Sequence, residues 1–241
     1  MSNATINFNQ KGASPDPNNN RSRRSFLKYG GASLATAGIL LSGCEEFYDY
    51  LPQKPKPKPD EISLGTGDIG VLNYAYALEQ LEAAFYTLVI SANCDFSQEE
   101  QTILMDLYKH EVVHREFFKA VLADKAIPAL EFDFSAIDFS SRSSILGAAK
   151  TFEDLGVAAY NGAGKLLENP DFLLIAGKIV SVEARHAAAI RSVFDDDPTS
   201  FAGDDVIDEN GLDRAFTTDV VLKAASDFIV TKIDGSDLPT S

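Results

Sequence analysis

Two of the three histidines in this chain follow a glutamate at a spacing of three residues. Glu111 and His114 end the stretch HEVVH, and Glu183 and His186 end the stretch VEARH. Residues three apart on an α-helix lie on the same side of it, so each Glu-x-x-His pair can hold one metal ion. The sequence therefore predicts two helices that each turn a carboxylate and an imidazole toward a metal site.

A second repeat adds one glutamate from each of two other segments. LEQLEAAFY, with Glu79 and Tyr86, aligns with FEDLGVAAY, with Glu153 and Tyr160, at an offset of 74 residues. The two Glu-x-x-His pairs have a similar offset, 72 residues. Four carboxylates and two imidazoles from four helices are the ligand set of di-iron and di-manganese bundles, and two divalent cations would neutralise the buried carboxylates. We predict a site for two divalent metal ions, Fe or Mn, held by Glu79, Glu111, His114, Glu153, Glu183 and His186.

Capping signals and residue patterns predict the elements that position these side chains. Asp68 is the expected cap of the first helix. Ser97 and Glu100 form a capping box at the start of the second. Asn169 followed by Pro170 predicts the start of the fourth. The predicted helices are 67–92, 97–125, 144–168, 170–194 and 217–230.

A long stretch without helical periodicity separates the second and third helices. In ALEFDFSAIDFSS (129–141), Phe132 and Phe134 alternate with polar residues, which predicts an extended crossover. The connections within each helix pair are short, so the paired helices should be antiparallel neighbours. The predicted fold is all-α: an antiparallel four-helix bundle with a long crossover between helices 2 and 3 and a short C-terminal fifth helix.

The composition fits one globular domain that does not depend on disulfides. The 241 residues are 45% hydrophobic and include two cysteines, which allows one sizeable core. The formal net charge is −15. We expect no nucleic-acid partner, because binding to phosphates needs clustered Lys and Arg.

The first 44 residues are predicted to be an export signal. Arg23 and Arg24 lie in SRRSFLK, which resembles a twin-arginine signal, and a short apolar run follows. LSGC then resembles a lipoprotein cleavage box, in which Cys44 becomes the lipidated first residue. The alternative is an uncleaved apolar anchor.

Cleavage and lipidation would give an exported protein attached to a membrane of the bacterial cell envelope, at its periplasmic or outer surface. Removal of residues 1–44 takes away five of the 21 basic residues and one of the 36 acidic residues, which leaves a net charge of −19. Because such a chain does not seek an anionic bilayer, the lipid must supply the attachment. The expected partners are the twin-arginine export and lipoprotein-processing machinery. Residues 45–65 are the predicted acidic and Pro/Lys-rich linker, and residues 66–241 the predicted bundle domain.

The ligand residues, their order and the long crossover resemble the ferritin-like superfamily over residues of about 66–195. With the export signal, the LEQLEAAFY stretch looks most like exported ferritin-like proteins related to plant desiccation-associated proteins. The resemblance implies that Glu79 and Glu153 are terminal ligands and that Glu111 and Glu183 bridge the two metals. It also implies that His114 and His186 each bind one metal, and that Tyr86 and Tyr160 support the ligands.

Three of the side chains near the predicted ligands have a second interpretation. Glu82, one turn after Glu79, could be a ligand, an acceptor for a neighbouring group or a surface charge, and Gly156 occupies its repeat position. Tyr86 and Tyr160 could be core aromatic residues whose hydroxyls find any acceptor.

HEVVH also matches the zinc metalloprotease pattern, in which His110 and His114 bind zinc and Glu111 activates a water molecule. That interpretation needs a third ligand such as Glu153 and leaves the other members of the ligand set unexplained. His110 also lies toward the edge of the apolar stripe of its helix, whereas His114 is near the centre. The dinuclear site is therefore the preferred prediction.

The function expected from the sequence is redox chemistry with oxygen or peroxide at the dinuclear site, with no catalytic residue assigned beyond the metal ligands. The alternative is a non-catalytic metal-binding or stress-protective bundle. A closed iron-storage cage is disfavoured, because a lipid anchor on every subunit would hinder its assembly. A smaller homo-oligomer is an alternative that the sequence does not exclude.

Overall fold

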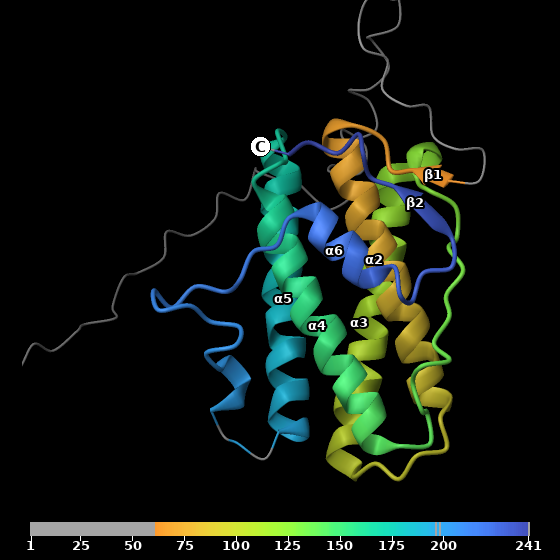
Figure 1. The fold of residues 1–241 in the computed structure, drawn as a ribbon, viewed down its shortest axis with the longest axis vertical. Coiled ribbons are helices and arrows are strands. Elements are labelled where there is room, and N and C mark those ends of the chain that lie inside the picture. Colours follow the sequence, from red (N-terminus) through yellow and green to blue (C-terminus); the bar gives the residue numbers. More distant parts are fainter. Residues whose placement is uncertain (1–60, 196, 198, 241) are drawn as a thin grey trace, which may run out of the picture. The chain divides into compact units, whose positions relative to one another are not determined.

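The structure is a computed structural model that describes residues 61–195, 197 and 199–240. The predicted export signal, with Cys44, and the predicted linker up to residue 60 lie outside the described residues. The described part contains four long helices in two hairpins, which confirms the predicted fold (Figure 1). The first hairpin pairs α2 (Gly67–Ser91) with α3 (Gln98–Leu122), and the second pairs α4 (Arg142–Gly164) with α5 (Pro170–Phe194).

Two of the predicted helix starts are confirmed. Ser97 and Glu100 form both hydrogen bonds of a capping box at the start of α3. The Asn169 side chain accepts a hydrogen bond from the N–H of Asp171, and Pro170 is the first residue of α5. These local signals fix where the two helices that carry the Glu-x-x-His pairs begin.

The predicted cap at Asp68 is wrong. Helix α2 begins after Thr66, which makes no side-chain capping bond. The Asp68 carboxylate instead accepts the backbone N–H groups of Glu168 and Asn169, at 2.8 and 3.0 Å. Asp68 therefore ties the start of α2 to the connection between α4 and α5, a contact between residues about 100 positions apart.

A short 3₁₀ turn, η2 (Ala123–Lys125), leads from α3 into the extended crossover. Two polar side chains of α2 hold the crossover in place. The amide oxygen of Asn73 accepts the N–H of Ile127, and that of Gln80 accepts the N–H of Leu130. The crossover therefore covers part of α2, and α2 is buried along most of its length.

The C-terminal segment packs on the crossover and completes the fold. It contains η3 (Ser200–Ala202), α6 (Thr218–Ala225) and β2 (Lys232–Asp234). The predicted fifth helix ends earlier than expected, because a turn follows α6 and Ile229 then forms an antiparallel bridge with Phe132 of the crossover. Strand β2 pairs in parallel with β1 (Glu61–Ser63). Residues 61–63, assigned to the linker by the sequence, are thus part of the folded unit.

None of the helices in the described part of the chain combines the length and the apolar character that crossing a bilayer requires.

Candidate metal centre

The fold brings all six predicted ligand residues together between the four long helices. Helix α2 supplies one of them, α4 another, and α3 and α5 two each. The four glutamates are fully buried, and the His186 side chain is 3% exposed. His114 is the most accessible, with 12% of its side chain exposed. The set consists of Glu79, Glu111, His114, Glu153, Glu183 and His186.

These residues form two groups of four that can each hold a metal ion, and the groups share two members. One group contains Glu79 and His114, the other contains Glu153 and His186, and both contain Glu111 and Glu183. Within each group the candidate ligand atoms all lie within 4.8 Å of one another.

Each shared carboxylate turns one oxygen to each group. His114 Nδ1 lies 2.9 Å from Glu183 Oε1 and 3.6 Å from Glu111 Oε2. His186 Nδ1 lies 2.9 Å from Glu111 Oε1 and 3.3 Å from Glu183 Oε2. Each of the two shared carboxylates therefore presents one oxygen to His114 and the other oxygen to His186.

The ligand atoms of the cluster have no hydrogen-bond partners. Among the described residues, nine buried polar side-chain atoms lack one, and eight of these belong to the cluster. They are Nδ1 of both histidines, both oxygens of Glu111 and Glu183, and one oxygen each of Glu79 and Glu153. The imidazole nitrogens are close to carboxylate oxygens, but these contacts lack hydrogen-bond geometry. Because buried polar atoms are normally paired, eight unpaired atoms gathered in one cluster indicate a place that could hold a metal ion.

Protons occupy the cluster when metal is absent. Burial raises the pKa of Glu79 well above its usual value, and burial likewise raises the pKa of Glu153 to about 8. Burial alone would lower the pKa of His114, but its contacts with the carboxylates of Glu111, Glu183 and Glu79 raise it to about 12. Burial would raise the pKa of Glu111, but the two imidazoles lower it to about 2. A cation that enters the cluster therefore replaces protons, and its affinity must increase with pH.

Two tyrosine hydroxyls connect α2 of the first hairpin with α4 of the second. Each donates a hydrogen bond to a glutamate that belongs to only one of the two groups. Tyr86 of α2 donates a hydrogen bond to Glu153 Oε1 of α4, at 2.5 Å, and Tyr160 of α4 donates one to Glu79 Oε1 of α2. Burial, followed by the charge of the bonded glutamate, raises both tyrosine pKa values, so both hydroxyls stay protonated. Each bond fixes one carboxylate oxygen and leaves the other, Oε2, directed at the cluster.

Glu82 is a fifth buried glutamate at the edge of the site. It is 3% exposed, which rules out a surface charge, and it belongs to neither group of four. Burial, and then the charges of the surrounding glutamates, raise its pKa well above the usual value. A Cβ at position 156 would lie 3.0 Å from Glu82 Oε1, so Gly156 leaves room for this carboxyl group between α2 and α4.

His110 is a residue of the site that the sequence reasoning placed outside it. Its Nδ1 lies 2.9 Å from Nε2 of His186, and the two rings stack with their centroids 5.1 Å apart. Burial, and then the positive charges of His186 and His114, lower the pKa of His110, which favours a neutral ring that can accept a hydrogen bond. Position 182, one repeat of 72 residues later, is a valine, so His114 has no equivalent histidine partner. The one-turn spacing of His110 from His114 was the only sequence signal for this role.

The zinc-protease arrangement does not form. His110 belongs to neither group of candidate ligands in the described chain, and its Nδ1 is directed at His186. The residues that this interpretation left unexplained, Glu79, Glu183 and His186, all lie in the cluster.

Comparison with known protein families gives a match. The family model of the ferritin-like domain matches residues 67–196, which is 130 of the 241 residues and includes all six members of the cluster. No curated protein sequence matches the chain at a significant level.

Proposed function

We propose that this chain, which belongs to the ferritin-like domain family, binds two ions of Fe or Mn between its four long helices and uses them in redox chemistry with oxygen or peroxide. The observation that carries the proposal is the division of the cluster into two groups of four ligand residues that share Glu111 and Glu183. A single structural ion would require one such group. Two groups with two shared carboxylates support a pair of neighbouring ions.

Each side chain has a distinct task in this proposal. Glu111 and Glu183 would be shared by the two ions, since each directs one oxygen at each group. Glu79 and Glu153 would each hold one ion through Oε2, because a tyrosine occupies the other oxygen. The two histidines would bind through Nδ1. The Nε2–H of His186 then donates to His110, which fixes the orientation of the imidazole.

The donor set and its surroundings favour a reactive centre over a purely structural one. Carboxylate and imidazole donors suit Fe and Mn, which would supply the one-electron steps that oxygen or peroxide chemistry needs. Four residues would hold each ion, which would leave room for a small ligand at an ion that prefers six donors. Because His114 is the only one of the six ligand residues with appreciable exposure, the surrounding helices would limit that ligand to small molecules.

Export and lipid attachment are proposed on the sequence alone. Twin-arginine systems transport folded proteins, so a chain with this signal can receive its metal before it leaves the cytoplasm. Cys44 would then hold the bundle at the surface of a membrane of the cell envelope. The alternative to catalysis is a bundle in which metal serves only to stabilise the fold or protect under stress.

The first experiment measures metal stoichiometry on protein purified without added metal. We expect about two ions of Fe or Mn per chain. Glu111→Gln keeps the size of the side chain but removes the charge shared by both groups, so it should lower the occupancy of both positions. Glu116→Gln, on the exposed part of the same helix, is the matched control and should retain two ions. One ion per chain, or full loading of the Glu111→Gln variant, would contradict the dinuclear site.

The second experiment separates catalysis from structural metal binding. Protein loaded with two ions should consume oxygen or peroxide over repeated turnovers, and chelation should abolish the activity. If the loaded protein is stable but shows no turnover and no redox change of the metal, the non-catalytic alternative is correct.

A further inference from the structure

A cavity of about 520 Å³ lies on the side of the α4–α5 hairpin that faces away from the metal centre. Its walls come from α4, α5, the segment 200–216 and α6 with the residues after it. At about 100° per residue, Leu155 in its wall lies about 160° around α4 from Glu153, and Arg191 lies about 140° around α5 from His186. The cavity and the metal centre therefore use opposite faces of the same two helices.

The size and lining of the cavity are those of a site for a small organic molecule. Such sites have volumes of about 300–1,000 Å³ and are mostly apolar with a few polar groups. Aromatic residues, including Phe152, Phe216 and Phe228, form part of the wall, and Phe201, which is 59% exposed, lies among the lining residues. Six further wall positions are alanines, which leave space between the aromatic rings: Ala158, Ala184, Ala187, Ala188, Ala202 and Ala224.

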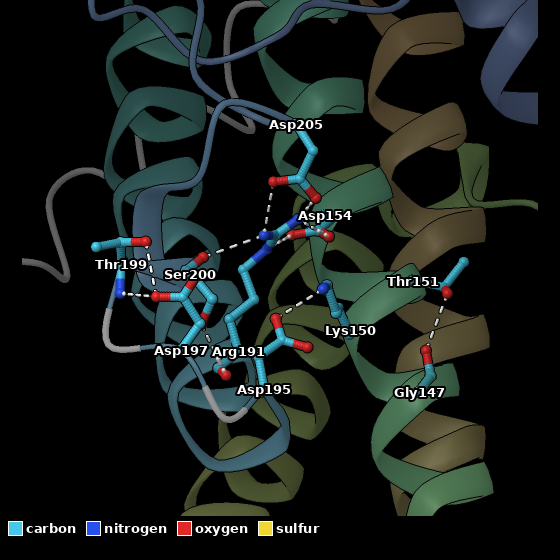
Figure 2. A network of polar contacts seen from close by, with 10 residues as sticks. All are labelled: Gly147, Lys150, Thr151, Asp154, Arg191, Asp195, Asp197, Thr199, Ser200 and Asp205. Atoms are coloured by element: carbon cyan, nitrogen blue, oxygen red, sulfur yellow. Dashed lines mark hydrogen bonds and ion pairs between the residues drawn. The ribbon is translucent and has the colours of Figure 1, made fainter.

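The polar end of the cavity is built around Arg191, whose guanidinium is buried (Figure 2). Its Nε and Nη2 donate to both oxygens of Asp154, at 2.8 and 2.7 Å. Its Nη1 and Nη2 donate to both oxygens of Asp205, at 3.0 and 2.7 Å. The remaining Nη1 hydrogen is directed to the carbonyl of Ser200, at 3.1 Å. All five N–H groups are therefore used, and Arg191 has none left for an anionic ligand.

The charges around the cavity favour a cation. Three carboxylates line it, those of Asp154, Asp205 and Asp213, against the guanidiniums of Arg191 and Arg214. Asp213 is exposed and makes no ion pair in the described chain, and partial burial, followed by the charge of Asp154, raises its pKa. A protonated amine beside Asp213 would neutralise this excess negative charge, whereas a carboxylate would add to it.

We propose that this cavity binds a small amphipathic organic cation, with an apolar body against the aromatic and alanine wall and a protonated amine beside Asp213. Binding here is separate from the metal chemistry. It would, however, contact the two helices that supply Glu153, Glu183 and His186, so an occupied cavity would stiffen the half of the bundle that holds these residues.

The test uses the full chain and three probes that share a phenyl ring and a two-carbon arm. Phenethylamine carries a cationic head, phenethyl alcohol a neutral one and hydrocinnamate an anionic one. Calorimetric titration at neutral pH should show saturable binding of phenethylamine, with the alcohol about tenfold weaker and hydrocinnamate weaker still. The assay requires neither metal nor turnover, so its outcome is independent of the function proposed above.

Variants locate the binding. Ala188→Leu places extra side chain in the cavity and should weaken phenethylamine binding about tenfold or more. Ala189→Leu changes the next position, which does not line the cavity, and should bind as the wild type does. Asp213→Asn removes the charge without changing the packing and should reduce the preference for the amine over the alcohol.

Absence of saturable phenethylamine binding to the wild-type chain would overturn the proposal. Equal binding by the Ala188→Leu and wild-type proteins would place the ligand elsewhere. Hydrocinnamate binding at least as tight as that of phenethylamine would show that the site selects anions, and the assigned ligand class would be wrong.

Discussion

The metal-free protein should lose stability as the pH rises from about 6.5 to about 8. The pKa of Glu153 is about 8 in the fold against an ordinary value of 4.5, so between these values the folded chain keeps a proton that the unfolded chain releases. The pKa of His114 is about 12 against 6.5, and this histidine therefore behaves in the same way above pH 6.5. Because the folded state binds more protons at both groups, the free energy of unfolding must fall as the pH rises.

The size of the effect follows from the number of groups. Each group that is protonated only in the folded state lowers the free energy of unfolding by about 1.4 kcal/mol per pH unit. Glu153 and His114 together should remove about 3 kcal/mol over this range, which is a large fraction of the roughly 5–15 kcal/mol that stabilises a domain. Glu79 and His186, whose pKa values are also raised, act in the same direction. Bound metal needs deprotonated ligands, so its own stabilising effect should grow as the pH rises.

Urea denaturation followed by circular dichroism, at the two ends of this pH range, measures both trends. One series contains a chelator and the other contains saturating Mn²⁺. Glu153→Gln cannot exchange the proton and should reduce the pH dependence of the metal-free protein by about 1.4 kcal/mol per pH unit. Glu99→Gln, an exposed position in the first turn of α3, should keep the wild-type dependence. A metal-free protein that is more stable at the higher pH, or a Glu153→Gln variant with the wild-type slope, would refute the buried, protonated cluster.

Three other predictions test the site, the packing and the localisation. The His110→Ala variant should retain two metal ions but bind them about 10–100-fold more weakly, because His110 only orients His186. The His186→Ala variant should instead lose occupancy of at least one ion, and metal titration distinguishes the two variants. Gly162→Ala should destabilise the fold by about 1–3 kcal/mol, because its Cβ would lie 1.7 Å from a backbone carbonyl oxygen of the segment before α6. Gly177→Ala, whose Cβ has open space, should instead stabilise α5 by about 0.5–1 kcal/mol in the same denaturation assay. Cys44→Ser should release the exported protein from the membrane fraction, and unchanged fractionation would contradict lipid attachment.

The sequence by itself determined the helices and the residues that the helices bring to the centre. The capping box at Ser97 and the Asn169–Pro170 start act within one helical turn, so they operate wherever the helix is placed. The Glu-x-x-His spacing likewise sets two side chains on one side of a helix before any packing occurs. The near-equal offsets of the two repeats then indicated that the four helices meet at one point.

The tertiary structure decided the contacts that depend on the rotation and spacing of neighbouring helices. Glu82 could have faced solvent, but α2 turns it inward, where the missing side chain of Gly156 leaves space. His110 was expected beside the site, and the approach of α3 to α5 places its ring against His186. The hydrogen bonds from Tyr86 of α2 to Glu153 of α4, and from Tyr160 of α4 to Glu79 of α2, also depend on how these two helices are rotated and spaced.

Contacts between distant segments were the least accessible to the sequence. Asp68 has the position and residue type of a helix cap, yet its carboxylate binds N–H groups about 100 residues away. Residues 61–63 have the composition of a linker end, yet they pair with β2 near the other end of the chain. A sequence pattern reports the interactions that a residue makes within its own helix or turn. Which unpaired donor or acceptor it meets across the fold is settled only when the helices pack, because that packing fixes the distance and direction between groups from different segments.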